Sequence, residues 1–264
     1  MRCLSSVLVF AALVPMLATA DEMTADALAA LVIERPANEG RVGTMHFELI
    51  NKRGRSRNRA ALMMHSDRDD AQRIGIFFMR PSMIQETAFL SINRPGDNDE
   101  NWLYLPATER VRRLPTSDRG DTYMGTDLTN GDIQENFKFP AEDWFFSLEV
   151  NPDQSPYPVL HGVARTPEIA KELGYQEFRA AIDVAHQFPV KVEYTDTDNA
   201  PLKTVEVKAI ERVGDAPTAM AIEVPNIQPG HTTRVHFTEM RHVPNLDVEF
   251  FAPDALAYGI PEVD

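Results

Sequence analysis

The chain has 264 residues, and its 26 basic and 40 acidic side chains give a formal net charge of −14. Such a surface repels nucleic acid and anionic bilayers at long range. An acidic surface also commonly serves only to keep a protein soluble, so the net charge identifies no partner by itself. The single cysteine, Cys3, lies near the start, which leaves no disulfide framework and no cysteine-ligated metal for the rest of the chain.

The first twenty residues have the pattern of an export signal. A basic residue precedes an apolar run at residues 7–14, and a small-residue cleavage site ends at Ala20. The apolar run is shorter than the roughly 20 residues that a membrane-spanning helix needs. We therefore predict a signal peptide at residues 1–20, a periplasmic location and no permanent membrane anchor. No linker, repeat or low-complexity run divides residues 21–264, which predicts one domain.

Helix signals are few along the remaining chain. Thr24 is a candidate N-cap for an amphipathic helix that ends before Pro36. A second helix should begin after Thr166 and stop at Gly174. A third is expected at residues 141–150, where an acidic start turns apolar.

Most of the chain alternates between apolar and polar residues in short runs, which is typical of β-strands. Short links between neighbouring runs favour antiparallel hairpins over helical crossovers. The fold class predicted is therefore mainly β (α+β), a strongly curved antiparallel sheet with a few helices on one face. The expected strands are residues 42–51, 57–65, 74–80, 87–93, 101–106, 178–183, 190–195, 202–213, 219–224 and 232–242.

Two of these strands, residues 74–79 and 102–105, are apolar on both faces. Both faces of such a strand need to be covered. Ordinary core packing covers them in most proteins, whereas a half-open barrel can leave one face for a ligand. Periodicity alone leaves both interpretations open.

One region carries a family signature. The strand at residues 102–106 (WLYLP) is followed by an Arg-rich turn (RVRRL, residues 110–114) and by the loop MGTDLTNGDI, in which Gly125, Asp127 and Asp132 are the most specific positions. This pattern resembles the outer-membrane lipoprotein-sorting family of periplasmic carriers, called LolA-like. The loop has Thr126 where Ser is commoner in that family.

The resemblance implies an incomplete β-barrel whose concave apolar side is covered by helices. It implies a carrier of lipid or lipoprotein acyl chains, with an inner-membrane transporter as donor and an outer-membrane acceptor. The same fold also occurs in periplasmic sensor or accessory interaction modules without cargo, which is the alternative function. The strand residues expected to line the cavity are Met45, Phe47, Leu49, Ile76, Phe78, Leu103, Leu105, Val190 and Val192.

The loop residues suit a structural role better than catalysis. Gly125 can adopt a positive φ, and Asp127 or Thr129 can cap a turn or start a short helix. The arginines of the neighbouring turn, Arg110, Arg112 and Arg113, are candidates for contact with head groups or a partner, and Arg119 belongs to the same basic patch. A second basic run at residues 52–59 is interpreted either as such a contact or as a charged strand edge that prevents aggregation.

An enzyme is not expected, and neither is a cofactor or metal. The sequence has no nucleotide-binding motif and no G-x-S-x-G, S-x-x-K or H-E-x-x-H pattern. His231 and His236 would point to opposite faces of one strand, and His236 and His242 would lie about 20 Å apart at about 3.3 Å per residue.

Overall fold

The computed structural model describes residues 23–37, 39–69, 71–94, 100–115, 119–149 and 155–263. The predicted signal peptide and its cleavage after Ala20 lie outside the described residues. The strands in the described part are β1 (Arg41–Ile50), β2 (Ser56–Arg68), β3 (Ala71–Arg80), β4 (Ala88–Asn93), β5 (Glu100–Leu105), β6 (Arg110–Leu114), β7 (Trp144–Glu149), β8 (Val159–Ala164), β9 (Glu177–Asp183), β10 (Phe188–Thr195), β11 (Pro201–Val213), β12 (Ala216–Asn226) and β13 (His231–His242). The helices are α1 (Ala25–Ile33), α2 (Asn130–Glu135) and α3 (Pro167–Leu173), with 3₁₀ turns η1 (Pro106–Thr108), η3 (Tyr123–Gly125), η5 (Val248–Phe251) and η6 (Pro253–Tyr258).

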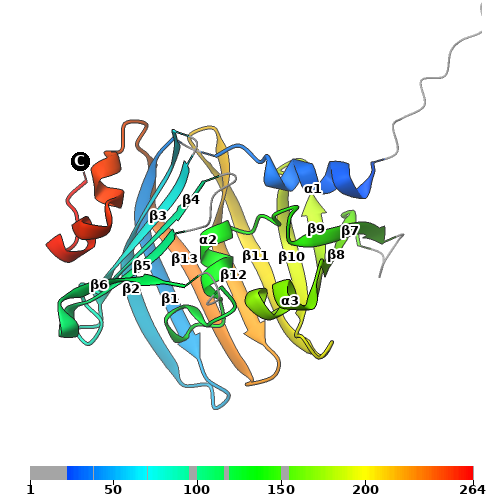
Figure 1. The fold of residues 1–264 in the computed structure, drawn as a ribbon, viewed down its shortest axis with the longest axis horizontal. Coiled ribbons are helices and arrows are strands. Elements are labelled where there is room, and N and C mark those ends of the chain that lie inside the picture. Colours follow the sequence, from blue (N-terminus) through cyan, green and yellow to red (C-terminus); the bar gives the residue numbers. More distant parts are fainter. Residues whose placement is uncertain are drawn as a thin grey trace, which may run out of the picture.

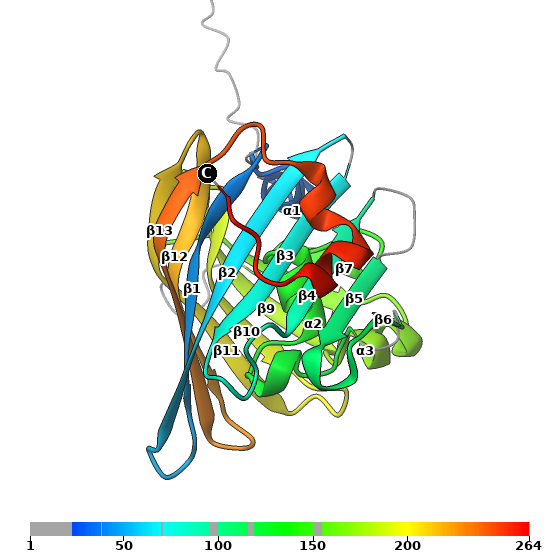
Figure 2. The same cartoon turned by 90° about the vertical axis from the view of Figure 1, so that its left-hand side faces the viewer.

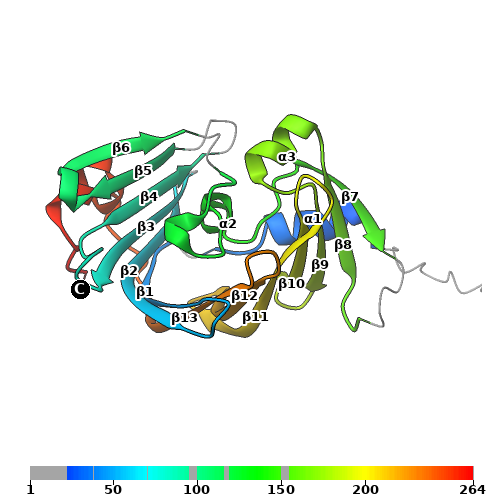
Figure 3. The same cartoon turned by 90° about the horizontal axis from the view of Figure 1, so that it is seen from below.

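The described strands form a single antiparallel sheet in the order β6-β5-β4-β3-β2-β1-β13-β12-β11-β10-β9-β8-β7. The sheet bends into an open arc with β6 and β7 at its two ends, and α1, α2 and α3 lie on the inner side (Figures 1 and 3). This confirms the predicted fold, an incomplete barrel with helices over the concave apolar face. It also confirms that short links between strands produce antiparallel neighbours.

Two of the predicted helices form for the expected local reasons. The Thr24 side chain accepts a hydrogen bond from the Ala27 amide at the start of α1. Thr166 does the same for Ile169 at the start of α3, and Gly174 ends that helix at a φ of +78°. Each cap satisfies an amide that has no partner within its own helix.

The prediction of a helix at residues 141–150 was wrong, because this segment contains β7, which pairs with β8. Its side chains alternate in burial: Trp144 is buried whereas Phe145 is exposed, and aromatic residues favour strands. The acidic start that suggested a first helical turn serves tertiary contacts, since Asp143 accepts from the Arg119 guanidinium. The strand β8 was not predicted.

The Arg-rich segment predicted as a turn is also a strand. β6 pairs with β5 at the edge of the sheet, with Leu103 opposite Arg112 and Trp102 opposite Arg113. Its arginines are exposed, and charged side chains are the usual way to protect an edge strand from further pairing. The actual turn is η1 with Glu109, whose φ is +51°.

The doubly apolar strands have a structural explanation on the outer side of the arc. The C-terminal segment with η5 and η6 crosses the outer side of β3, β4 and β5 (Figure 2). Its Phe251 and Leu256 are buried there with Phe77 and Leu90 in an outer core. One face of each apolar strand is therefore covered by the chain's own C-terminal residues, and only the inner face remains to consider for a ligand.

Candidate functional site

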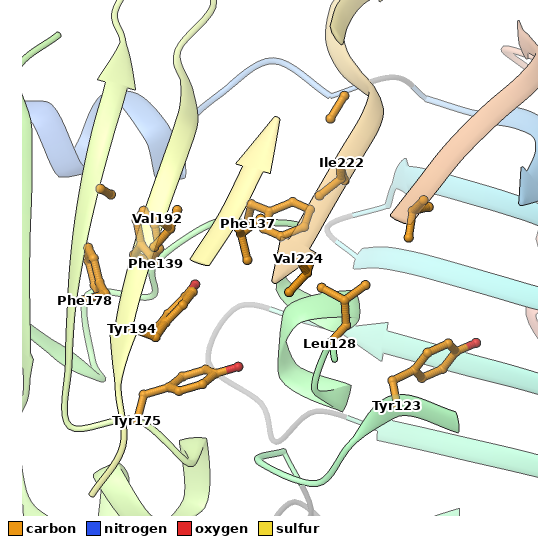
Figure 4. Packing of buried hydrophobic residues seen from close by; sticks show 14 of the residues in the cluster. Tyr123, Leu128, Phe137, Phe139, Tyr175, Phe178, Val192, Tyr194, Ile222 and Val224 are labelled. Carbon is orange, nitrogen blue, oxygen red and sulfur yellow. The ribbon is translucent and has the colours of Figure 1, made fainter. Parts of the chain in front are cut away.

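The inner side of the arc is occupied by the segment from residue 119 to residue 140, which we call the central loop. Its Leu128 and Phe137 meet Ile222 and Val224 of β12, while Tyr123 lies to one side and Phe139 to the other (Figure 4). Together with α1 and the inward side chains of the strands, these residues form one buried cluster, the inner core. The loop therefore supplies apolar side chains where a second sheet would otherwise pack.

Five of the predicted cavity residues meet in this inner core: Met45, Phe47, Ile76, Phe78 and Val192. The Phe47 and Phe78 rings stack with centroids 6.0 Å apart, and both contact the Tyr123 ring of the central loop. These strand residues are covered by the central loop and not by solvent.

The other predicted cavity residues are placed differently. Leu49 is partly buried against the inner core. Leu103 lines a separate hollow of about 250 Å³ with Phe89, Tyr123 and Arg112. Leu105 is half-buried at the end of β5, and Val190 is half-buried where the pairing of β10 with β9 shifts register. Neither of these two residues belongs to the inner core, so the structure does not bring them to the predicted cavity.

The space that the inner core leaves free is small. A cavity of about 60 Å³ lies between the strands and the central loop, with apolar walls that include Met63, Ile76 and Val235. At its polar end Arg41 and His65 line the wall. Ligand pockets for small molecules are typically about 300–1,000 Å³. The hollow expected from sequence is therefore largely filled by the central loop in this conformation.

A buried ion pair fastens the central loop to the sheet. Lys203 Nζ of β11 lies 2.6 Å from Asp132 Oδ2, and their side chains are 2% and 3% exposed. The same ammonium donates to the Asp127 carbonyl at 2.8 Å. The Tyr175 hydroxyl donates to both carboxylate oxygens, at 3.1 and 3.0 Å, and burial beside this carboxylate raises the tyrosine pKa well above its usual range.

Asp132 also starts α2. The Thr129 amide donates to the Asp132 carboxylate at 2.7 Å, and the Asp132 amide donates to the Thr129 hydroxyl at 3.1 Å. This reciprocal pair is a capping box, which satisfies two amides at a helix start. The Asp132 carboxylate thus caps the start of α2 and also attaches this helix to β11.

Two further contacts hold the first half of the loop. The Asp127 amide donates to the Thr233 hydroxyl of β13 at 2.9 Å, and that hydroxyl donates to Asp127 Oδ2 at 2.8 Å. The Arg59 guanidinium of β2 donates to the Met124 carbonyl. Gly125 adopts a φ of +71°, where a side chain would be strained. We call this set of polar contacts between the central loop and the sheet the clasp, because it holds the loop over the inner core.

Three residues of this clasp were not anticipated from the sequence, namely Lys203, Tyr175 and Thr233. Lys203 lies in a strand among other charged residues, and nothing local distinguishes it from a solvent-facing lysine. Lys203 is buried because β11 passes beneath α2, and this crossing depends on the tertiary structure and not on neighbouring residues.

The predicted basic contacts separate into two groups. Arg110, Arg112 and Arg113 remain exposed on β6, with Arg113 above the Trp102 ring at 5.8 Å. Arg119, in contrast, is an internal anchor of the central loop, since its guanidinium pairs with Asp143 at 2.7 Å and with Glu172 at 3.3 Å. Arg119 therefore does not belong to an exposed contact surface.

The comparisons with known proteins give the family. A protein-family model described as an uncharacterized protein matches residues 70–258, more than half of the chain. The chain belongs to this family. No curated protein matches it.

Solved structures share the LolA-like fold. A DUF1329 family protein from Desulfovibrio piger superposes with a TM-score of 0.78 at 21% identity, covering 88% of this chain and 97% of that one. A domain described as an outer membrane lipoprotein-sorting protein from Vibrio parahaemolyticus has a TM-score of 0.77 at 24% identity, with 88% and 99% covered. A LolA superfamily protein from Nitrosomonas europaea has a TM-score of 0.67 at 16% identity, with 89% and 100% covered.

The prediction that His236 and His242 share a strand face was wrong, because the pairing of β13 with β1 shifts register between Thr238 and Arg241, where Glu239 has a φ of +55°. His236 pairs with His46 and His242 pairs with Arg41, five residues apart on β1, so the two histidines lie on opposite faces. His236 stacks on His46 of β1, with ring centroids 4.6 Å apart. In the part of the chain that the structure describes, no three potential ligands come together as a metal site. Within the same residues, no helix has the length and apolarity needed to span a bilayer.

Proposed function

We propose that this protein is a periplasmic carrier that shelters acyl chains of a lipid or lipoprotein between the curved sheet and the central loop. A leader at residues 1–20 would export a single carrier domain at residues 21–264. The observation that carries the proposal is the nature of the inner cover: a loop held by a small number of polar anchors, and not a second sheet, closes the apolar face.

The energetics explain why such a cover suits a carrier. Exposing a sixteen-carbon acyl chain to water costs about 12 kcal/mol at about 0.8 kcal/mol per methylene. When the central loop swings out, the chain can replace Leu128, Phe137 and Phe139 against the strands, so the inner face never becomes fully wet. Because the free cavity holds only about 60 Å³, binding requires this displacement.

The comparisons support the proposal through the fold. The Vibrio parahaemolyticus domain, described as a lipoprotein-sorting protein, covers nearly the same arc over 88% of this chain. The proposed route begins at an inner-membrane transporter and ends at an outer-membrane acceptor. No nucleotide-binding motif supplies energy within this chain, so the donor would have to drive loading.

A crosslink of the loop tests the proposal directly. Asp127 and Thr233 side chains are in contact, and Asp127→Cys with Thr233→Cys would join the loop to β13. The contact of Lys203 with residue 127 uses the backbone carbonyl, so it survives the substitution. We expect the oxidised protein to exclude a fluorescent fatty acid and the reduced protein to bind it.

The same double variant is its own control, because one reductant switches it between the two states. Lipid extraction and mass spectrometry of the natural protein from a bacterial host should also yield bound acyl lipid. A natural protein that carries no lipid and ignores the fluorescent probe would refute the carrier function.

The alternative is an interaction module of a transporter. The observation in its favour is the free edge of the sheet, where β6 exposes Arg110, Arg112 and Arg113. We propose this edge as the contact for a partner or a head group. Arg112→Glu with Arg113→Glu should weaken such binding in a salt-dependent way. Partner capture that persists in the oxidised crosslinked protein would favour the module over the carrier.

A further inference from the structure

A group of buried basic side chains lies at the polar end of the 60 Å³ cavity. Arg41 and His65 line it, and Arg35 adjoins it through Asn136 and Phe188. Arg35, Arg41 and His65 are only 4%, 7% and 1% exposed.

The electrostatics of this basic cluster are unbalanced. Burial and the neighbouring Arg41 charge lower the pKa of Arg35 to about 9, and burial lowers that of Arg41 to about 10. Burial and the Arg41 charge hold the His65 pKa well below its usual range, and Lys138 adds to the repulsion. Among the described residues, Asp67 is the acid whose charge acts in the opposite sense on Arg41 and Lys138.

The cluster also has unused hydrogen-bonding capacity. Arg35 Nη1, Arg41 Nε and His65 Nδ1 are buried and have no hydrogen-bond partner among the residues that the structure describes. One other nitrogen of each arginine is engaged: Arg35 Nη2 donates to the Asn136 carbonyl at 2.7 Å, and Arg41 Nη1 donates to the Thr218 hydroxyl at 3.1 Å. A buried donor without an acceptor destabilises the fold, and more so when it is charged. These three sites therefore call for an acceptor.

The histidine nitrogen belongs with the two guanidinium donors. His65 Nε2 lies 3.1 Å from Gln72 Nε2. An amide nitrogen can only donate, so with this amide orientation the ring accepts at Nε2 and carries its proton at Nδ1. The free Nδ1 is then a donor beside the cavity.

We infer that the cavity binds a single-chain anionic amphiphile, a long-chain carboxylic acid, with its carboxylate on Arg41, Arg35 and His65. This inference rests on the proposed carrier function and names its substrate class. The carboxylate supplies the charge and the acceptors that the cluster lacks, and guanidinium geometry matches a carboxylate. The alkyl chain follows the apolar walls formed by Ile76, Ile222 and Val235 once the central loop moves.

The burial of the cluster selects a small head group. A bulky phosphodiester head would need an opening to solvent, whereas both arginines are under one-tenth exposed. The acyl chains of a lipoprotein are esters or amides, whose carbonyl oxygens can accept a hydrogen bond but carry no negative charge to balance the two guanidinium groups. The cluster therefore favours a free acid over an esterified chain.

The test compares hexadecanoate with its methyl ester and with hexadecyl phosphate, each displacing an uncharged fluorescent probe at pH 8. Pairing one buried charge typically changes affinity by about tenfold or more, so the natural protein should prefer the acid to the ester by at least that factor. Arg41→Gln should reduce the preference to below about threefold while the ester still binds as before. Arg165→Gln, which changes an exposed arginine just after β8 that belongs to neither proposed site, is the matched control and should change neither affinity.

A second variant and a spectroscopic measurement guard against misfolding. Arg35→Gln should lower the same preference for the acid over the ester. The NMR resonance of the labelled carboxyl carbon of hexadecanoate should shift on binding to the natural protein, and it should shift less on binding to either variant. Equal binding of acid and ester, or a preference that survives in both variants, would overturn the carboxylate site and leave the carrier function intact. Tighter binding of hexadecyl phosphate would also overturn it. Binding of none of the three compounds would instead refute the carrier function.

Discussion

Replacement of Lys203 by methionine removes the cation that neutralises Asp132 beneath the central loop. Both side chains are almost fully buried, with 2.6 Å between Nζ and Oδ2, and the ammonium also donates to the Asp127 carbonyl. Removal of one partner of a buried pair typically costs about 3–5 kcal/mol, because the other charge stays buried. We expect Lys203→Met to lower the free energy of unfolding by that amount.

The matched control is Lys191→Met, which breaks an exposed pair with Glu193 and should cost less than about 1 kcal/mol. The double variant Lys203→Met with Asp132→Asn removes both charges and keeps an acceptor for Thr129, so it should recover about 2 kcal/mol of the loss. Urea unfolding followed by circular dichroism measures all of these differences. Hydrogen exchange should also show faster opening of residues 122–135 in Lys203→Met. The reasoning fails if Lys203→Met costs no more than the control, or if the double variant is no more stable than the single one.

Three other predictions concern the loop and the cavity. Gly125→Ala should lose about 1–2 kcal/mol in thermal unfolding, because φ is +71° although a Cβ would meet nothing within 4 Å; Gly125→Asn should lose less, and equal losses would point to another cause. Tyr123→Phe should leave stability unchanged or raise it by up to about 1 kcal/mol, since its buried hydroxyl has no hydrogen-bond partner in the described part of the chain; a clear loss would contradict this. His65 has a depressed pKa in the folded protein, so the unfolded chain takes up its proton first as pH falls below about 6.5, and stability should decline from there by at most about 1.4 kcal/mol per pH unit. Unfolding curves of His65→Gln between pH 5 and 7.5 should lack that part of the decline, and an unchanged slope would exclude His65 as its source.

Local sequence signals were sufficient where the deciding contacts are close in the chain. Thr24, Thr166 and Gly174 mark helix ends because each acts on amides within a few residues. Thr129 with Asp132 forms its capping box for the same reason. The alternation of apolar residues located most strands, since the side-chain period of a strand is itself local.

The secondary-structure predictions that relied on charged side chains were wrong where the partners of those side chains are distant in the chain. Asp143 looks like part of a first helical turn, but it pairs with Arg119 and the residues after it form β7. The arginines of residues 110–114 look like a turn and form an edge strand instead. In each case the charge has no local partner that would define the structure.

What the sequence alone determined is the curved antiparallel sheet and the family to which its central motif belongs, because apolar periodicity and turn chemistry act over a few residues. Only the tertiary structure decided what fills the arc. Residues more than seventy positions apart, such as Asp132 and Lys203, pair across the interior, and the C-terminal segment covers the outer face of the strands. Burial of charge depends on which elements cross in space, and that information is spread over the whole chain.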